Sequence, residues 1–228
     1  MVMKLESVVP FGRSLDEYRR MFALSDDDLE RMILSVADGP ASFNTEMTAL
    51  GRRVISVDPL YAFSGGDIEK QFAAVVDNII AQVKATPDDW EWSYHRSPEH
   101  LRGNRVNVLG NFISDYDSGK TEGRYRIGEL PTLEFEDFQF DLALCSHFLF
   151  LYSDQYSYEF HQASVYEMLR VAREVRIFPL LSLMLERSRH LQPLVDDLIS
   201  QGYSVAVRRI GYELQRGANE MLQITRSV

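Results

Sequence analysis

A glycine and an acidic residue stand at a spacing that is typical of nucleotide binding. Gly39 follows the stretch "ILSVAD", and Asp58 comes nineteen positions later, after "VISV". Glycine lets a ligand approach the backbone because it has no Cβ. An acid about 20 residues past such a turn commonly accepts hydrogen bonds from ribose hydroxyl groups. Gly39 and Asp58 therefore predict a site for a cofactor that carries a ribose.

Two more groups of residues with reactive or polar side chains end predicted strands. Residues 128–131 (GELP) follow "RYRI", and residues 145–147 (CSH) follow "FDLAL". A ligand of an open α/β sheet binds beyond the carboxyl ends of its strands, so both groups are expected at the same site. His147 has two interpretations there, a hydrogen-bonded structural histidine or a general base. The five histidines lack metal-ligand spacing and the chain has one cysteine, so no metal site is predicted.

The elements that must position these residues alternate between strand and helix. Apolar, β-branched stretches predict strands within the segments listed here: 31–36, 52–57, 124–130, 138–152, 175–181, 203–210 and 220–227. Helical spacing fills most of the intervals, and Pro59 ends the second strand. The last two strands are expected to pair as a hairpin. The pattern predicts a doubly wound α/β fold: a mostly parallel seven-stranded sheet, helices on both faces and an antiparallel C-terminal hairpin.

One domain is expected to span residues 1–228, because neither a linker nor a repeat interrupts the pattern. Residues 1–30 are expected to form a helical cap, with Ser14 and Glu17 completing a capping box. Residues 86–124 read as an irregular and partly helical insertion. Its tryptophans, Trp90 and Trp92, have two interpretations, a small satellite core or a lid over substrate.

The order of these pieces resembles a class I S-adenosylmethionine-dependent methyltransferase over nearly the whole chain. "ILSVADGPASF" is similar to the first motif of that family, and "VISVDP" to its ribose-binding segment. "IGELP" and "FDLALCSHFLF" are similar to its next strand ends, and "GYELQRGANEMLQITRS" to its closing hairpin. The resemblance implies methyl transfer from S-adenosyl-L-methionine to a nucleophile.

The resemblance also implies roles for individual residues. The cofactor-binding residues would be Arg13 at the methionine carboxylate, Tyr18 over the cleft, Ala37, Asp38 and Gly39 at the methionine and ribose, Asp58 with Pro59 at the ribose, Glu129 and Leu130 at the adenine, and Cys145 and Ser146 in the floor. His147 is the candidate catalytic residue in that floor. For Arg13 and Tyr18 an ordinary surface arginine and a core tyrosine are equally good interpretations.

Three positions of the first motif depart from the family pattern. Ser35 stands in place of the acid inside the strand, and Ala37 and Ala41 stand in place of two glycines. These departures favour an alternative function, a non-catalytic domain that binds the cofactor, its demethylated product or a protein. A nicotinamide-dependent oxidoreductase is a third hypothesis, which the absent GxGxxG motif and the C-terminal hairpin disfavour.

The charge of the chain narrows the class of partner. Lys plus Arg is 24 and Asp plus Glu is 34, a net charge of −10. Such a field repels nucleic acid and anionic membrane surfaces, so we expect a small-molecule substrate, no nucleic acid and no membrane. The single cysteine excludes an internal disulfide and favours a reducing compartment, the cytoplasm. The oligomeric state is left open.

Overall fold

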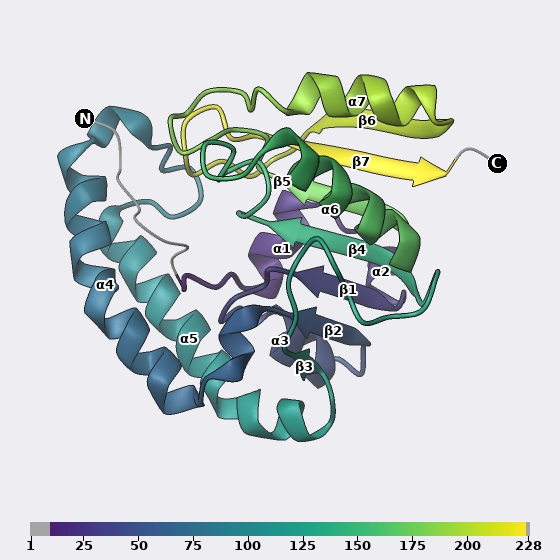
Figure 1. Ribbon diagram of the computed structural model, residues 1–228. Helices are drawn as coiled ribbons and strands as arrows, with labels where there is room; N and C mark the ends of the chain where they lie inside the picture. The colour runs from purple at the N-terminus through teal and green to yellow at the C-terminus, as the bar shows by residue number, and fades with distance from the viewer. Residues whose placement is uncertain (1–9, 227–228) are drawn as a thin grey trace.

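A computed structural model describes residues 10–226 as a seven-stranded sheet with helices on both sides (Figure 1). The strand order is β3-β2-β1-β4-β5-β7-β6. All neighbouring pairs are parallel except β5–β7 and β6–β7. The strands are β1 (Ile33–Val36), β2 (Val54–Val57), β3 (Tyr125–Arg126), β4 (Phe140–Ser146), β5 (Ala172–Phe178), β6 (Tyr203–Arg209) and β7 (Glu220–Arg226). The predicted fold class is confirmed, including the antiparallel hairpin.

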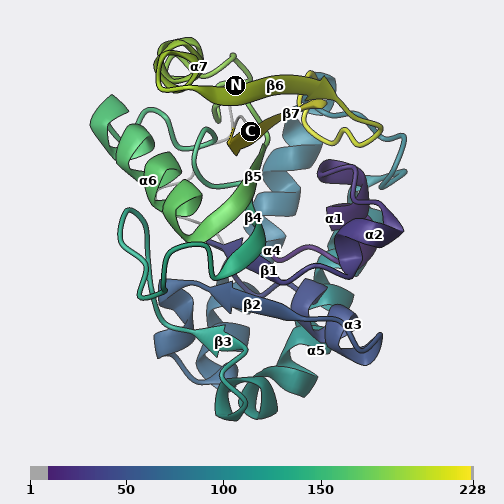
Figure 2. The ribbon, with the colours of Figure 1, turned by 90° about the vertical axis from the view of Figure 1, so that its right-hand side faces the viewer.

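Helices cover the two faces of the sheet and enclose two large hydrophobic cores. They are α1 (Leu15–Met21), α2 (Asp26–Leu29), α3 (Phe43–Ala49), α4 (Gly65–Ala85), α5 (Pro98–Thr121), α6 (Tyr158–Val171) and α7 (Leu191–Ser200), with short 3-10 helices at Pro59–Ala62 and Pro87–Asp89. Figure 2 shows α6 and α7 on one face and α1, α2 and α3 on the other. Within β1, Ile33 packs in the core of α1, α3, α4 and α5, whereas Leu34 packs in that of α6 and α7. This alternation follows from the two-residue period of a strand.

Local sequence signals explain where several elements begin and end. The predicted capping box of α1 is present, with Ser14 accepting from the backbone of Glu17 and Glu17 accepting from the backbone of Ser14. Ser25 and Asp28 repeat this arrangement at α2. Gly202 follows α7 with φ 83, a conformation that costs glycine little.

Residues 86–124 are more regular than their sequence indicates. Helix α5 accounts for 24 of them. Its buried side chains include Leu101, Arg105, Phe112 and Tyr116, which have helical spacing. A charged arginine inside this stripe interrupts the apolar periodicity on which the sequence interpretation depends. In contrast, the predicted strand at 124–130 contributes only two residues to the sheet, Tyr125 and Arg126.

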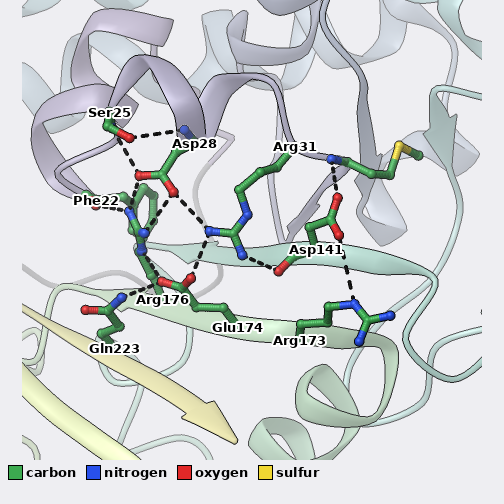
Figure 3. Close-up of polar contacts among 10 residues, drawn as sticks. Phe22, Ser25, Asp28, Arg31, Asp141, Arg173, Glu174, Arg176 and Gln223 are labelled. Carbon is green, nitrogen blue, oxygen red and sulfur yellow. Dashed lines mark hydrogen bonds and ion pairs between the residues drawn. The ribbon is translucent and has the colours of Figure 1, made fainter. Parts of the chain in front are cut away.

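A charged network fastens α2 to the sheet, away from the carboxyl ends of the parallel strands (Figure 3). Arg31 Nη1 lies 2.9 Å from Asp28 Oδ1 and 2.8 Å from Glu174 Oε2. Arg176 Nε donates to Glu174 Oε1 at 2.7 Å, and its Nη1 lies 3.1 Å from Asp28 Oδ2. Each carboxylate thus serves two guanidinium groups, and α2 is held on β5. The carboxyl ends of the parallel strands, where a ligand site is expected, lie at the opposite end of the sheet.

No helix among the described residues is both long and apolar enough to cross a membrane. In Figure 1 the parallel strands point toward the side on which α4 and α5 stand. The residues that end β1, β2 and β4 therefore face this helix pair.

Candidate functional site

Two adjoining hollows lie at the carboxyl ends of the parallel strands. They share Ala37, Gly39, Asp58 and Phe148, so together they form one cleft. The hollow on the α5 side has a cavity volume of about 110 Å³ and the other about 490 Å³. Together they reach the size of a cofactor-binding pocket. We call them the α5-side hollow and the Glu129-side hollow.

Asp58 stands where the two hollows meet, directly after β2. Its Oδ2 accepts from the backbone N–H of Gly39 at 2.8 Å, and its Oδ1 from that of Leu60 at 2.7 Å. A carboxylate offers about four acceptor positions, so two remain for a ligand. Burial raises the pKa of Asp58 to about 6, against the two backbone hydrogen bonds that favour the ionised form.

The loop after β1 brings backbone close to the cleft. Ala37 and Gly39 both have positive φ, 53 and 55. A Cβ built on Gly39 would meet no protein atom within 4 Å, so this position faces open space. Ala37 keeps the left-handed conformation that glycine would adopt more easily. The loop therefore retains a ligand-binding shape with one glycine.

Asp38 lies beneath the loop with its carboxylate inside the protein. Ser35 Oγ and Ser56 Oγ each donate to it at 2.6 Å, and the hydroxyl of Tyr18 donates as well. Asp38 as a whole residue is 5% exposed, and burial raises the pKa of its carboxylate. Tyr18 itself is fully buried and stacks on Phe43, so it packs under the cleft as well as lining it.

Arg13 reaches the α5-side hollow from the segment before α1. This segment is clamped to the β1–α3 loop: the N–H of Ser42 donates to the carbonyl of Arg13 at 3.1 Å, and a Cβ on Gly12 would collide with Pro40. Arg13 donates to the carbonyl of Phe11, but its Nε is buried without a hydrogen-bond partner among the described residues. Burial and the nearby Arg105 lower its pKa to about 10. An unpaired buried donor of this kind suits an anionic group of a ligand.

A buried ion pair supports the same hollow. Arg105 Nη1 and Nη2 each lie 2.8 Å from a carboxylate oxygen of Glu17. Tyr212 donates to Glu17 at 2.9 Å, and His95 Nε2 lies 3.2 Å from it. The ion pair with Arg105 and the hydrogen bond with His95 hold the pKa of Glu17 well below its usual value despite full burial. The cluster joins α1, α5 and the link between β6 and β7.

The three residues that end β4 and begin the next loop divide between core and cleft. Cys145 is fully buried and does not line either hollow, and burial raises the pKa of its thiol to about 12. Ser146 and His147 line the α5-side hollow. Ser146 Oγ and His147 Nδ1 lie 2.9 Å apart. Burial and two arginines lower the pKa of His147 well below 6.5, so its ring is neutral at pH 7.

The Glu129-side hollow gathers the remaining predicted residues. Pro59, Glu129 and Leu130 line it. Phe148, Tyr156 and Phe160 add an aromatic wall that the sequence interpretation missed. The rings of Tyr156 and Phe160 stack with centroids 4.3 Å apart. An apolar slot with aromatic walls suits a flat heterocycle.

Other residues of the α5-side hollow were also missed. Trp90, Arg105 and Gln215 line it, although they are far apart in sequence. An isolated bridge pairs Trp90 with Gln215. The aromatic content of residues 86–124 is a sequence signal for Trp90, whereas Arg105 and Gln215 have no comparable signal. No group of three or more His, Cys, Asp or Glu residues within 10–226 is arranged to hold a metal ion.

The strand order and the antiparallel β7 confirm that the chain has the class I methyltransferase fold. Sequence comparison finds "Uncharacterized protein MJ0045" of Methanocaldococcus jannaschii, which is 32% identical over 225 residues covering 98% of this chain and 99% of that protein. The chain belongs to the same family as MJ0045. No family model matches.

Comparison of this MJ0045 relative with solved structures finds similarity to methyltransferases at low sequence identity. One is magnesium protoporphyrin IX methyltransferase of Synechocystis with bound S-adenosylmethionine, at 13% identity and a TM-score of 0.49, covering 93% of this chain and 78% of that one. Another is an S-adenosylmethionine-dependent methyltransferase of Aquifex aeolicus, at 12% identity and a TM-score of 0.47, covering 93% and 89%.

Proposed function

We propose that the protein is an S-adenosylmethionine-dependent methyltransferase that acts on a small molecule. The geometry of Asp58 carries the proposal. Its carboxylate is oriented by two backbone N–H groups, stands at the end of β2 and faces both hollows. Its free acceptor positions suit the two hydroxyls of a ribose that joins a group in one hollow to a group in the other.

The two hollows differ in the way that the two ends of this cofactor differ. Arg13, with its unpaired buried Nε, would take the methionine carboxylate in the α5-side hollow. The open space over Gly39 would admit the ribose and methionine close to backbone. The aromatic wall of Tyr156 and Phe160, with Leu130, would hold the adenine in the Glu129-side hollow.

When bound, the cofactor supplies a methyl group on an electrophilic sulfonium. The protein then mainly has to align donor and acceptor at bonding distance, which is how orientation accelerates a reaction. A base is required only for an acceptor that arrives protonated. His147, neutral and at the lining of the α5-side hollow, is the proposed base. A small-molecule acceptor in a reducing compartment agrees with the charge of −10 and the single free cysteine.

A second candidate is a non-catalytic domain that binds S-adenosylmethionine or S-adenosylhomocysteine, or a protein partner. One observation favours it. Ala37 holds a left-handed φ of 53 in the loop that would contact the cofactor, where glycine would bear no strain.

Two measurements separate these candidates. Calorimetric titration of the purified protein with S-adenosylmethionine, and separately with NAD, should give binding of the first alone. Incubation with a metabolite panel should then release S-adenosylhomocysteine for an enzyme. Binding without turnover on any panel member would favour the non-catalytic domain, and binding of NAD alone would refute the assigned cofactor.

A further inference from the structure

We propose that the methyl acceptor is an uncharged, largely apolar small molecule that presents a hydroxyl group to His147. This inference rests on the proposed function and specifies the substrate class of the same cleft. The α5-side hollow extends beyond the loop that would hold the cofactor. The apolar side chains of its lining that come from outside this loop border that extension, which we assign to the acceptor.

The walls of the extension are apolar and come from separate elements. Six buried side chains form them: Ile79, Val83, Trp90, Leu101, Leu183 and Leu214. Four of them come from α4, α5 and the link between these helices, whereas Leu183 lies between β5 and α7 and Leu214 between β6 and β7. An apolar molecule that binds against these side chains removes apolar surface from water, and this burial favours binding.

One of these walls is fastened by backbone hydrogen bonds. The N–H of Glu91 donates to the carbonyl of Leu214, and the N–H of Arg216 to that of Asp89, each at 2.8 Å. Trp90 Nε1 donates to Thr86 Oγ1 at 2.9 Å, so the ring has a fixed orientation. The apolar surface is therefore formed before an acceptor arrives, which reduces the entropy cost of binding.

The charged groups around the extension leave no partner for a charged acceptor. Its lining includes two carboxylates and two guanidinium groups among the described residues. Asp38 accepts from three hydroxyls, and Asp58 faces the ribose position. Arg105 is paired with Glu17, and Arg13 is assigned to the methionine carboxylate. A charged acceptor would lose its hydration without gaining a counterion, so an uncharged one is favoured.

His147 gives the extension one polar group suited to a hydroxyl. When Nδ1 donates to Ser146 Oγ, Nε2 carries a lone pair and can accept a proton. His147 Nε2 would take the hydroxyl proton as the acceptor oxygen bonds to the methyl carbon and the carbon–sulfur electron pair leaves with sulfur. The products are a methyl ether and S-adenosylhomocysteine.

Binding of matched probes tests the charge preference. The protein is first saturated with S-adenosylhomocysteine and then titrated with 2-naphthol, 2-naphthoate and 2-naphthylmethylammonium at pH 7.5. We expect 2-naphthol to bind at least about tenfold more tightly than either ion. Equal or tighter binding of an ion, or no binding of any probe, would overturn the inference. Failure of S-adenosylhomocysteine itself to bind would instead overturn the proposed function, and the inference with it.

Two variants locate the bound probe. Leu214→Glu places a carboxylate in the wall and should shift the preference toward the ammonium probe, whereas Leu50→Glu, on the exposed surface, should not. In His147→Leu the advantage of 2-naphthol over 2-methylnaphthalene, about fivefold for one hydrogen bond, should vanish. Retained affinity for S-adenosylhomocysteine shows that each variant is folded. An unchanged preference in Leu214→Glu, or an unchanged hydroxyl advantage in His147→Leu, would contradict the placement.

Discussion

Ser35 Oγ donates a 2.6 Å hydrogen bond to Oδ1 of Asp38, three residues further along the chain. Tyr18 of α1 and Ser56 of β2 donate to the same carboxylate. One buried acid thus gathers hydroxyls from two neighbouring strands and the first helix under the loop that borders the cleft. Position 35 holds a serine rather than an acid, and Asp38 supplies a carboxylate beside it.

Replacing Asp38 with alanine should destabilise the fold. The change would leave three buried hydroxyls to find new partners, and each unsatisfied group costs about 1–3 kcal/mol. We expect the free energy of unfolding, from urea denaturation, to fall by about 2–4 kcal/mol. Asp26→Ala is the control, because the Asp26 side chain is 88% exposed and its ion pair should contribute less than about 1 kcal/mol. Similar losses in both variants would refute the role of Asp38.

Ala37→Gly should have the opposite effect. Ala37 holds a φ of 53, which costs an L-residue about 1–2 kcal/mol and glycine little. The greater conformational entropy of glycine in the unfolded chain offsets part of this gain. We therefore expect a net rise of about 0.5–1 kcal/mol in the free energy of unfolding. Ala74→Gly, in the exposed part of α4, should lower it by about 0.5–1 kcal/mol. A loss of stability in Ala37→Gly would show that the loop is not strained there.

Arg105→Ala should cost much more stability than Arg102→Ala on the same helix. Arg105 and Glu17 are 1% and 0% exposed, and removing one partner leaves the other charge buried, at about 3–5 kcal/mol. Arg102 pairs with Asp77 at 45% and 75% exposure, for which less than about 1 kcal/mol is expected. Thermal and urea unfolding of both variants would measure the difference. Equal losses in the free energy of unfolding would mean that the ion pair of Arg105 with Glu17 contributes no more than an exposed one.

The pH dependence of cofactor binding should follow Asp58. Burial raises the pKa of Asp58 to about 6, above the value of about 3.9 in an unfolded chain. The folded state therefore binds this proton more tightly, and the contribution of Asp58 to stability falls as pH rises from about 4 to 6. Ribose hydroxyls donate to the ionised form, so affinity for S-adenosylmethionine should fall by up to about tenfold per pH unit below pH 6. In Asp58→Asn the profile should be flat between pH 5 and 7, and a persisting slope would assign the titration to another group.

The strand ends of the site were predictable because local chemistry specifies them. Gly39, Asp58 and Glu129 follow recognisable strands and turns, and parallel strands bring their carboxyl ends to one edge. The structure places all of the predicted residues except Cys145 at the lining of the cleft. Cys145 differs because its side chain packs in the core of α6 and α7, whereas the next residue of β4, Ser146, lines the cleft. The assignment of each residue to a part of the cofactor remains a prediction.

The α5 side of the cleft was not predictable because it depends on long-range contacts. Glu17 fits a local capping box, and nothing in its neighbourhood indicates that its carboxylate also binds Arg105, 88 residues away. Trp90 likewise meets Gln215 across more than half of the chain. Trp90 packs in the core of α1, α3, α4 and α5 and also lines the cleft. Neither of its two predicted roles, part of a small satellite core or of a lid over substrate, describes both of these contacts.

Calorimetric titration of S-adenosylmethionine into three proteins tests the central claim most directly. The wild type and Asp77→Ala, which removes a carboxylate that is 75% exposed on α4, should bind the cofactor with equal affinity. Asp58→Ala should lose binding by at least about a hundredfold, since both ribose hydrogen bonds to a charged acceptor disappear. Its unfolding curve should still show a folded protein. No binding by the wild type, or equal binding by Asp58→Ala, would contradict the account.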